Sequence, residues 1–413
     1  MGVRLQFEGI RCFFEPQDVP LRPVTLLVGE NSSGKTTFLA ICQVAHAMAF
    51  GASPLPFNER PFSLGAYDQI ASRRSGRSGA ARLFSMAIAL QDRNRSSLSA
   101  VFHQRDGQPA FESLRLSGGD TVYSAKAGDS ALEYSVSIEG DGRPIRIPHA
   151  PIPNNWLAFV ITNKFAELVS RPAVLERVRG ALDAIQGEFG RRPYAFAPIR
   201  TSPQRTYDPV MAAPEPEGSH VPMLLAMLAR SAGTLGWASM QAELSEFGAK
   251  SGLFDSIEVV TKGKKDSDPF QIGVKSDGPT FNLIDVGYGV SQALPILVDT
   301  IQRASGQTFL LQQPEVHLHP RAQAELGSFF ARQADKRRRF VIETHSDYLV
   351  DRIRMEVRRK TLTPDEVALL YFERRKNGAT IHHLELDRDG SITNPPPGYR
   401  QFFLNEEREL LGI

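Results

Sequence analysis

Nine residues near the start of the chain have the types and spacing of a phosphate-binding loop. They are Gly29, Glu30, Asn31, Ser32, Ser33, Gly34, Lys35, Thr36 and Thr37, and the first eight fit the pattern G-x-x-x-x-G-K-[ST]. Phosphate is bound by converging backbone N–H groups, and glycine at both ends leaves room for it. Lys35 is then expected to reach the β- and γ-phosphates, and the hydroxyl of Thr36 to bind Mg²⁺. The predicted chemistry is the binding of ATP with Mg²⁺.

The residues on either side of this loop favour the structure that it needs. Val24–Val28 is a short apolar run typical of a buried strand. Phe38–Ala45 has apolar residues at helical spacing. The loop therefore follows a strand and opens a helix, whose N-terminal dipole also favours an anion.

Two later apolar runs end in polar residues and are candidates for the rest of the site. Thr308–Pro320 reads TFLLQQPEVHLHP, and Phe340–Ser346 reads FVIETHS. From residue 285 onward helical and strand patterns alternate, which indicates a parallel sheet. Ligands bind at the carboxyl ends of the strands in such sheets, so we expect both polar ends beside the phosphate loop.

These stretches carry a resemblance to a known group of proteins. The chain resembles the ABC-type ATPases of the overcoming-lysogenization-defect (OLD) and recombination/SMC-like group, whose second motif often reads E-E-P-E-x-x-L-H-P. It is most similar to a prokaryotic branch with QQPE-x-HLHP, with the signature G-x-G-x-S-Q-x-L-P and with a C-terminal PPPGYRQFF…ELLG. The resemblance covers residues 1–50 and 285–413 well and residues 193–207 moderately.

The resemblance implies a role for each polar position. Gln312 and Gln313 lie where the family has its magnesium-orienting acid and its catalytic glutamate. His345 lies at the switch histidine, which contacts the γ-phosphate. Glu315 follows in the loop after the strand, near the expected junction of two subunits.

The segment DVGYGVSQ, residues 285–292, resembles a variant of the family signature. Ser291 is expected to cap the next helix, with Pro295 in its first turn. The N-terminus of that helix would then point at the γ-phosphate bound by a partner subunit. Ser291 has no role in the site of its own subunit, so the resemblance implies a homodimer or higher oligomer that sandwiches ATP.

The two glutamines depart from the family pattern. Hydrolysis needs a general base or a carboxylate that orients water, and glutamine is a very poor base. Gln312 and Gln313 also remove negative charge that helps to hold Mg²⁺. Three alternatives remain open: Glu315 acts as the base, the ATPase is slow, or the protein binds ATP without useful turnover.

Other residues have a functional and a structural interpretation. Arg200 and Arg205, in APIRTSPQR, resemble a P-L-R-x-x-P-x-R stretch of the same branch, and they either bind phosphate or pair with nearby acids. Gln69 is a weak candidate for the glutamine that is expected after the first helix. The basic runs 336–339 and 352–360 either contact DNA or are solvated helix faces.

The domain organisation follows from these patterns. We expect an α/β fold, a P-loop NTPase head of the ABC type with a parallel sheet, an antiparallel β lobe and a helical or mixed insertion. Residues 1–80 and 281–413 form the two parts of the head. Residues 81–150 form the β lobe, because short alternating runs separated by turn clusters predict an antiparallel meander. Residues 151–280 form the insertion.

Composition narrows the function further. The chain has 413 residues with 48 Lys+Arg and 46 Asp+Glu, a net charge of +2, which argues against a histone-like nucleic-acid binder. It has no apolar run of the ~18 residues that cross a membrane, no signal-peptide pattern and only two cysteines, so we expect a cytoplasmic protein without a membrane partner. His317 and His319 are either loop residues or an H-x-H metal site.

The function predicted from the sequence is an ATPase (ATP phosphohydrolase), slow or activated by a partner, that acts as a nucleotide-driven dimer switch. The resemblance implies a role in bacterial anti-phage defence or DNA maintenance together with a separately encoded effector protein, a nuclease or toxin. The alternative is an ATP-locked scaffold that does not hydrolyse ATP and that assembles or restrains an effector.

Overall fold

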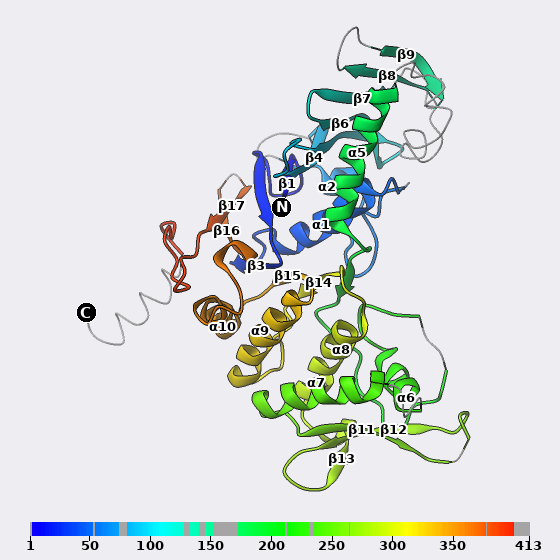
Figure 1. Cartoon of the computed structure of the whole chain (residues 1–413), viewed down its shortest axis with the longest axis vertical. Helices are drawn as coiled ribbons and strands as arrows, with labels where there is room; N and C mark the ends of the chain where they lie inside the picture. Colours follow the sequence, from blue (N-terminus) through cyan, green and yellow to red (C-terminus); the bar gives the residue numbers. More distant parts are fainter. Residues whose placement is uncertain are drawn as a thin grey trace, which may run out of the picture.

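The computed structural model describes residues 2–52, 54–73, 81–127, 133–139, 145–151, 172–210, 213–230, 235–263, 265–376 and 378–399. Three sheets organise these residues. Figure 1 shows an antiparallel sheet at the top, a mainly parallel sheet in the middle, and a small sheet with its helices at the bottom. The middle layer is the part that positions the phosphate loop.

The middle sheet has the order β10-β14-β15-β3-β16-β17, and all neighbours are parallel except β16 and β17. Its strands are β10 (Tyr194–Phe196), β14 (Thr308–Gln312), β15 (Arg339–Glu343), β3 (Val24–Gly29), β16 (Val367–Arg375) and β17 (Gly378–Leu384). The central strands are nearly continuous apolar runs because both of their faces are covered. Along β14, for example, Phe309 and Leu311 belong to one core and Leu310 to the other.

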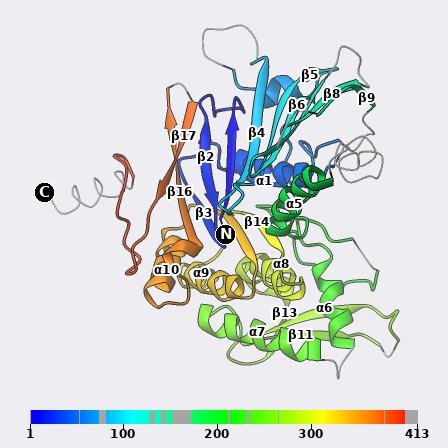
Figure 2. The same cartoon turned by 45° about the horizontal axis from the view of Figure 1, so that its top comes forward.

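One face of this sheet is covered by α1 and by the antiparallel sheet beyond it. The antiparallel sheet has the order β2-β1-β4-β5-β6-β7-β8-β9. Its strands are β1 (Val3–Glu8), β2 (Gln17–Leu21), β4 (Leu83–Leu90), β5 (Ser97–Arg105), β6 (Gln108–Gly118), β7 (Thr121–Ala127), β8 (Glu133–Glu139) and β9 (Ile145–Pro151). The predicted meander is therefore confirmed. The first two strands of the chain extend it at one edge, where β2 lies beside β17 (Figure 2).

Three helices of the described residues belong to this upper part of the molecule. They are α1 (Lys35–Ala49), α2 (Tyr67–Ile70) and α5 (Pro172–Phe189). The core here is shared, since residues of α1, α5, the antiparallel strands and the parallel strands form one buried apolar cluster. The phosphate loop is thus built into the contact between two sheets, and α1 runs from the loop into that shared core.

The opposite face of the parallel sheet is covered by α8 (Tyr288–Gln302), α9 (Pro320–Asp335) and α10 (Asp347–Arg358). A smaller layer packs on these helices (Figure 1). It contains α6 (Val221–Arg230), α7 (Leu235–Ser251), β11 (Ser256–Thr261), β12 (Phe270–Lys275) and β13 (Thr280–Asn282), followed by the short 3₁₀ helix Leu283–Asp285. A second 3₁₀ helix, Pro364–Glu366, leads into β16.

Among the residues that the structure describes, none of the helices is both long and apolar enough to cross a membrane. The C-terminal PPPGYRQFF…ELLG stretch used in the sequence comparison lies largely outside the described residues, which end at position 399.

Candidate functional site

The phosphate loop connects β3 to α1, and only glycine fits at both of its ends. Gly29 has φ +138°, and a Cβ there would lie 2.4 Å from the carbonyl oxygen of Phe372. Gly34 has φ +101°, and a Cβ there would lie 2.5 Å from the ring of Phe13. The two glycines are therefore required by the backbone path as well as by the space that a phosphate needs.

Gly34 is also the residue before the first turn of α1, and no side chain caps the helix. The first N–H groups of a helix have no partner within it, so they are free to bind an anion. Lys35 is 3% exposed, and its Nζ donates to the carbonyl oxygens of Gly29 (2.9 Å) and Glu30 (2.7 Å). Burial lowers its pKa, and the carboxylates of Glu343, Glu30 and Glu315 oppose this effect. The loop thus holds a cation, folded back on its own carbonyls, at the place predicted for the phosphates.

The hydroxyl of Thr36 is hydrogen-bonded to an acid from a neighbouring strand, Glu343. Thr36 Oγ1 donates to Glu343 Oε2 at 2.8 Å. Glu343 ends β15, the neighbour of β3, and its carboxyl is largely buried, which raises its pKa, while the Thr36 hydroxyl and the Lys35 cation oppose the rise. A hydroxyl and a carboxylate are hard oxygen ligands of the kind that Mg²⁺ takes in proteins. These two residues therefore fit a magnesium ion beside the phosphate loop.

Glu343 was not among the residues predicted for the metal, although it stands in the FVIETHS run that sequence analysis assigned to a strand end. Gln312, the predicted position, lies directly opposite Glu343 in the ladder between β14 and β15. Gln312 is one strand further from the phosphate loop than Glu343. The fold thus brings a carboxylate to the site from the adjacent strand, and the strand order that does so cannot be read from a motif.

Glu315 and His345 meet at the carboxyl ends of β14 and β15. The backbone N–H of His345 donates to Glu315 Oε1 at 2.7 Å, and Glu315 is 7% exposed. Burial raises the pKa of Glu315, and hydrogen bonding of the carboxylate opposes the rise. The His345 ring is exposed, and burial of part of the ring and the Lys35 cation lower its pKa, so it is neutral at pH 7. Two of the predicted catalytic residues are therefore in contact.

Gln313 adopts a left-handed backbone conformation, with φ +43°, at the point where the chain leaves β14. Its N–H donates to the carbonyl oxygen of Glu343 at 2.8 Å. This bond ties the turn that carries Glu315 to the end of β15, where Glu343 lies two residues before His345. A strained residue at such a point is typical of functional sites.

Ser291 does not cap α8, and that prediction was wrong. The helix begins at Tyr288, with Gly287 as its N-cap, so Ser291 lies in the first turn and donates to the carbonyl oxygen of Tyr288 at 2.9 Å. Pro295 is correspondingly inside α8 and not in its first turn. The helix therefore begins one turn earlier than expected, after an extended residue at Gly287 (φ −59°, ψ 150°).

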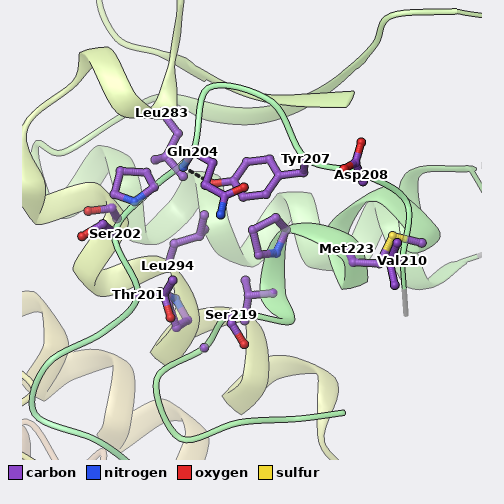
Figure 3. Close-up of a pocket in the computed structure, with 16 residues that line it drawn as sticks. Thr201, Ser202, Gln204, Tyr207, Asp208, Val210, Ser219, Met223, Leu283 and Leu294 are labelled. Atoms are coloured by element: carbon purple, nitrogen blue, oxygen red, sulfur yellow. Dashed lines mark hydrogen bonds between the residues drawn. The ribbon is translucent and has the colours of Figure 1, made fainter. Parts of the chain in front are cut away.

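The side chain of Ser291 is buried against a cavity of about 320 Å³ within the chain. Figure 3 shows this cavity between α8, the start of α6 and the segment 201–210, where the backbone N–H of Gln204 donates to the hydroxyl of Tyr207 at 2.9 Å. At the surface the first turn of α8 instead presents Gly287 and Tyr288, and Tyr288 is 63% exposed. A contact with a partner subunit would therefore begin with these two residues.

The two arginines and the glutamine that the sequence also suggested lie in different surroundings. Arg205 forms a two-point ion pair with Asp285 (2.9 and 2.6 Å), whereas Arg200 is buried near Glu315. Gln69 lies in α2, where its Oε1 accepts from the N–H of Ala66 and closes the first turn, and it lines a cavity together with Arg11 and Cys12.

The basic runs are largely engaged within the chain. Arg339 pairs with Glu188, and Arg352 with Glu325. Lys336, Arg354 and Arg359 likewise pair with acids of this chain. These contacts favour a structural interpretation of both runs. Residues 352–358 lie on the helix α10, whereas 336–339 run from the turn after α9 into β15, so the helix-face interpretation is wrong for that run.

The H-x-H stretch has a structural role in part. His319 is the N-cap of α9, and its ring accepts from the N–H of Arg321 at 3.4 Å. The ring of His317 lies beside that of Tyr288, with centroids 5.9 Å apart. Within the described residues no three His, Cys, Asp or Glu side chains form a group that could hold a metal.

Comparison with known proteins gives matches of two kinds. The structure resembles an SMC head bound to the C-winged helix domain of ScpA (12% identity, 93% of this chain and 98% of the other, TM-score 0.45). It also resembles the SMC head domain from Thermotoga maritima (12%, 93% and 98%, TM-score 0.40) and an SMC head domain bound to the C-terminal domain of ScpA derived from Pyrococcus furiosus (11%, 100% and 99%, TM-score 0.44). A search of curated proteins finds no match.

A family model matches residues 191–351, and its description is "AAA domain, putative AbiEii toxin, Type IV TA system". The matched part contains Ser291, the Gln312–Glu315 turn and His345, and the phosphate loop precedes it in the chain. The strand order, the loop between β3 and α1 and this match agree on the fold. The chain has the mixed α/β fold of a P-loop NTPase, and residues 191–351 are similar to an AAA domain.

Proposed function

We propose that this protein binds and hydrolyses ATP with Mg²⁺ and acts as a nucleotide-driven dimer switch. The observation that carries the proposal is the joining of the phosphate loop to the ends of β14 and β15. Thr36 bonds to Glu343, Glu315 bonds to the backbone of His345, and Lys35 lies in the field of both carboxylates. These contacts support our proposal of a phosphate cradle, a metal-binding acid and a candidate base at one edge of one sheet.

Each residue then has a task in hydrolysis. The N–H groups of α1 and the Nζ of Lys35 bind the phosphates, and Lys35 leaves the loop carbonyls to do so. Thr36 and Glu343, with Gln312 beside them, would hold Mg²⁺, which when bound would neutralise charge on the phosphate oxygens. Glu315 accepts the proton of the attacking water, and Gln313 and His345 orient the water and the γ-phosphate.

A cavity of about 710 Å³ supports a place for the nucleoside. Its lining includes Arg11 and Cys12, and Cys12 lies against the phosphate loop, with its Sγ 3.8 Å from the carbonyl oxygen of Ser33. Phe14 and Leu64 add apolar surface. A base and ribose in this cavity would be continuous with phosphates bound at the start of α1.

The dimer part of the proposal rests on the surface around the start of α8. Tyr288 is exposed there together with Ile284 (41%) and Phe281 (49%). An exposed apolar patch beside a helix N-terminus fits a second copy whose bound γ-phosphate faces that helix. Ser291 supports the turn from inside the chain and does not touch the partner's nucleotide itself.

The effector part of the proposal rests on the family description and on the resemblance of the sequence to the QQPE-x-HLHP branch of the OLD group. The description names an AbiEii toxin of a type IV toxin–antitoxin system, which supports a role in bacterial defence against phage or in DNA maintenance. We infer that a separately encoded toxin or nuclease responds to the closed or open state of the dimer.

Phosphate release with Mg-ATP, measured for the wild type and for Lys35→Ala, tests the function. We expect turnover in the wild type only, and a loss of ATP affinity in Lys35→Ala of about 10- to 100-fold, because one charge-assisted hydrogen bond is removed. Light scattering in the same samples should show an ATP-dependent dimer of the wild type. Equal phosphate release from both proteins would contradict the proposal.

The second candidate is an ATP-locked scaffold, and Gln312 and Gln313 favour it, because both replace acids of the family pattern. Gln313→Glu separates the two candidates. If the protein is a scaffold, its phosphate release is close to background. The new carboxylate should then raise the rate about tenfold or more, as a positioned general base does. If Glu315 is already the base, Gln313→Glu should leave the rate unchanged, with Gln313→Ala as the matched control.

A further inference from the structure

Arg200 is buried with none of its three guanidinium nitrogens hydrogen-bonded. The residue is 2% exposed, and among the described residues Nε and both Nη atoms have no partner. Burial lowers the pKa of Arg200 to about 10, so the group is still a cation at neutral pH. A buried charged donor without acceptors costs stability, and such a group persists where another state of the protein provides its partners.

The backbone of Arg200 is fixed at the edge of the sheet where the phosphates bind. It follows β10, which runs parallel to β14, so it leaves the sheet on the same side as Gln312. Its N–H donates to Gln292 Oε1 of α8 at 3.4 Å, and the N–H of Thr201 donates to the carbonyl oxygen of Glu217 at 2.9 Å. The segment is anchored on both sides while the guanidinium is left free of hydrogen bonds.

Glu315 is the acid whose charge acts on Arg200. Its negative charge opposes the lowering of the Arg200 pKa by burial. Glu315 is better satisfied: its Oε1 accepts from the N–H of His345 and the Thr344 side chain also lies within reach of the carboxylate, while Oε2 has no well-formed hydrogen bond among the described residues. The Arg200 cation and the Glu315 carboxylate are therefore close enough to interact electrostatically, although they do not hydrogen-bond each other. That pairing suits a phosphate oxyanion on the arginine side and a water molecule on the carboxylate side.

Arg205 shows that the segment does not by itself leave an arginine without hydrogen-bond partners. It lies five residues further along and pairs with Asp285 through two short hydrogen bonds at the surface. One arginine of the APIRTSPQR stretch is thus satisfied within the chain and the other is not. The difference marks Arg200 as the one that lacks a ligand, and it makes Arg205 a matched control.

We propose that Arg200 is a phosphate-binding arginine supplied by the same subunit, which donates to the γ-phosphate oxygens when ATP closes the site. The inference rests on the proposed ATP binding and names a further residue of that site. Water attacks the γ-phosphorus as the bond to the β,γ-bridging oxygen breaks, Glu315 takes the water proton, and ADP and inorganic phosphate form. Arg200 stabilises the charge on the γ-oxygens throughout, as preorganised donors do.

Calorimetry with ADP, alone and with aluminium fluoride, tests the proposal without turnover. We expect the wild type and Arg205→Ala to bind ADP at least about tenfold more tightly when aluminium fluoride stands in for the γ-phosphoryl group, because a charge-assisted contact is gained. Arg200→Ala should bind ADP equally well but show no such gain. Added guanidinium chloride at millimolar concentration should restore part of the gain in Arg200→Ala, and it should have no effect on Arg205→Ala.

The outcomes are distinct. A wild type that does not bind ADP removes the proposed function and the inference with it. A wild type that binds ADP but shows no gain, a gain kept in Arg200→Ala, or a loss that guanidinium does not restore, would each overturn the role of Arg200 alone.

Thermal stability gives a second readout. Replacing an arginine that supports the fold should lower the melting temperature, whereas replacing one that is kept to bind a ligand should raise it. Without nucleotide, Arg200→Met should melt at a higher temperature than the wild type, since it removes an unpaired buried charge at similar volume. A lower melting temperature would show that Arg200 serves the fold and would overturn the proposal.

Discussion

Replacing Glu315 by glutamine is expected to lower ATP turnover about 10²- to 10⁴-fold, the range for a lost general base. The reason is geometric. Glu315 is the carboxylate in the turn after β14, its Oε1 accepts from the N–H of His345, and its Oε2 has no well-formed hydrogen bond among the described residues. The affinity for ATP should be nearly unchanged, because glutamine can still accept the bond from His345. The measurement is kcat with Mg-ATP beside a binding constant for ATP.

The pH dependence provides the control for Glu315. Burial raises its pKa above the ordinary value, and the base acts only when it has lost its proton. The rate of the wild type should therefore rise with pH through this raised pKa and then level off, and Glu315→Gln should lack that limb. An acidic limb that survives in Glu315→Gln would assign the base to another residue.

Stability should change in the opposite sense to activity. A carboxyl whose pKa is raised in the folded protein favours the fold when protonated, so the wild type loses stability as the pH rises through that pKa. Glu315→Gln carries no such cost. The melting temperature of Glu315→Gln at pH 7 should be no lower than that of the wild type. As the pH falls, the melting temperature of the wild type should rise relative to that of Glu315→Gln. A variant that melts early at every pH would show that the lost activity reflects lost structure.

Glu343→Gln is expected to lower the apparent affinity for Mg²⁺ about 10- to 100-fold, the usual effect of disturbing a metal site. Glu343 Oε2 accepts from Thr36 at 2.8 Å, so it is the acid placed to share a metal with the loop hydroxyl. The matched control is Gln312→Ala on the neighbouring strand, which should change the affinity less.

The readout for Glu343 need not be turnover. Binding of Mn²⁺ with ATP can be followed by electron paramagnetic resonance, and it should be lost in Glu343→Gln and in Thr36→Val but kept in Gln312→Ala. If Gln312→Ala lost the metal and Glu343→Gln kept it, the magnesium site would lie at the position that the family pattern implies.

The sequence alone determined the elements whose signal is local. The phosphate loop needs glycine at two fixed positions because the backbone at Gly29 and Gly34 admits no Cβ, so its pattern is readable in any chain. The apolar runs at 24–28, 308–312 and 339–342 are nearly continuous because both faces of the parallel sheet are covered. The meander of β4 to β9 was readable because each strand pairs with the next one along the chain.

The tertiary structure decided which side chains of those elements meet. Glu343 bonds to Thr36, 307 residues away in sequence, because the order of strands places β15 between β14 and β3. Likewise α8 starts at Tyr288, one turn before the cap that the sequence predicted, and Ser291 is buried inside the chain as a result. Arg200 and Arg205 are alike in sequence, and only the burial of one and the pairing of the other distinguish them. Strand order and burial are properties of the whole chain, and so the acid at the phosphate loop and the unpaired arginine became visible only in the folded protein.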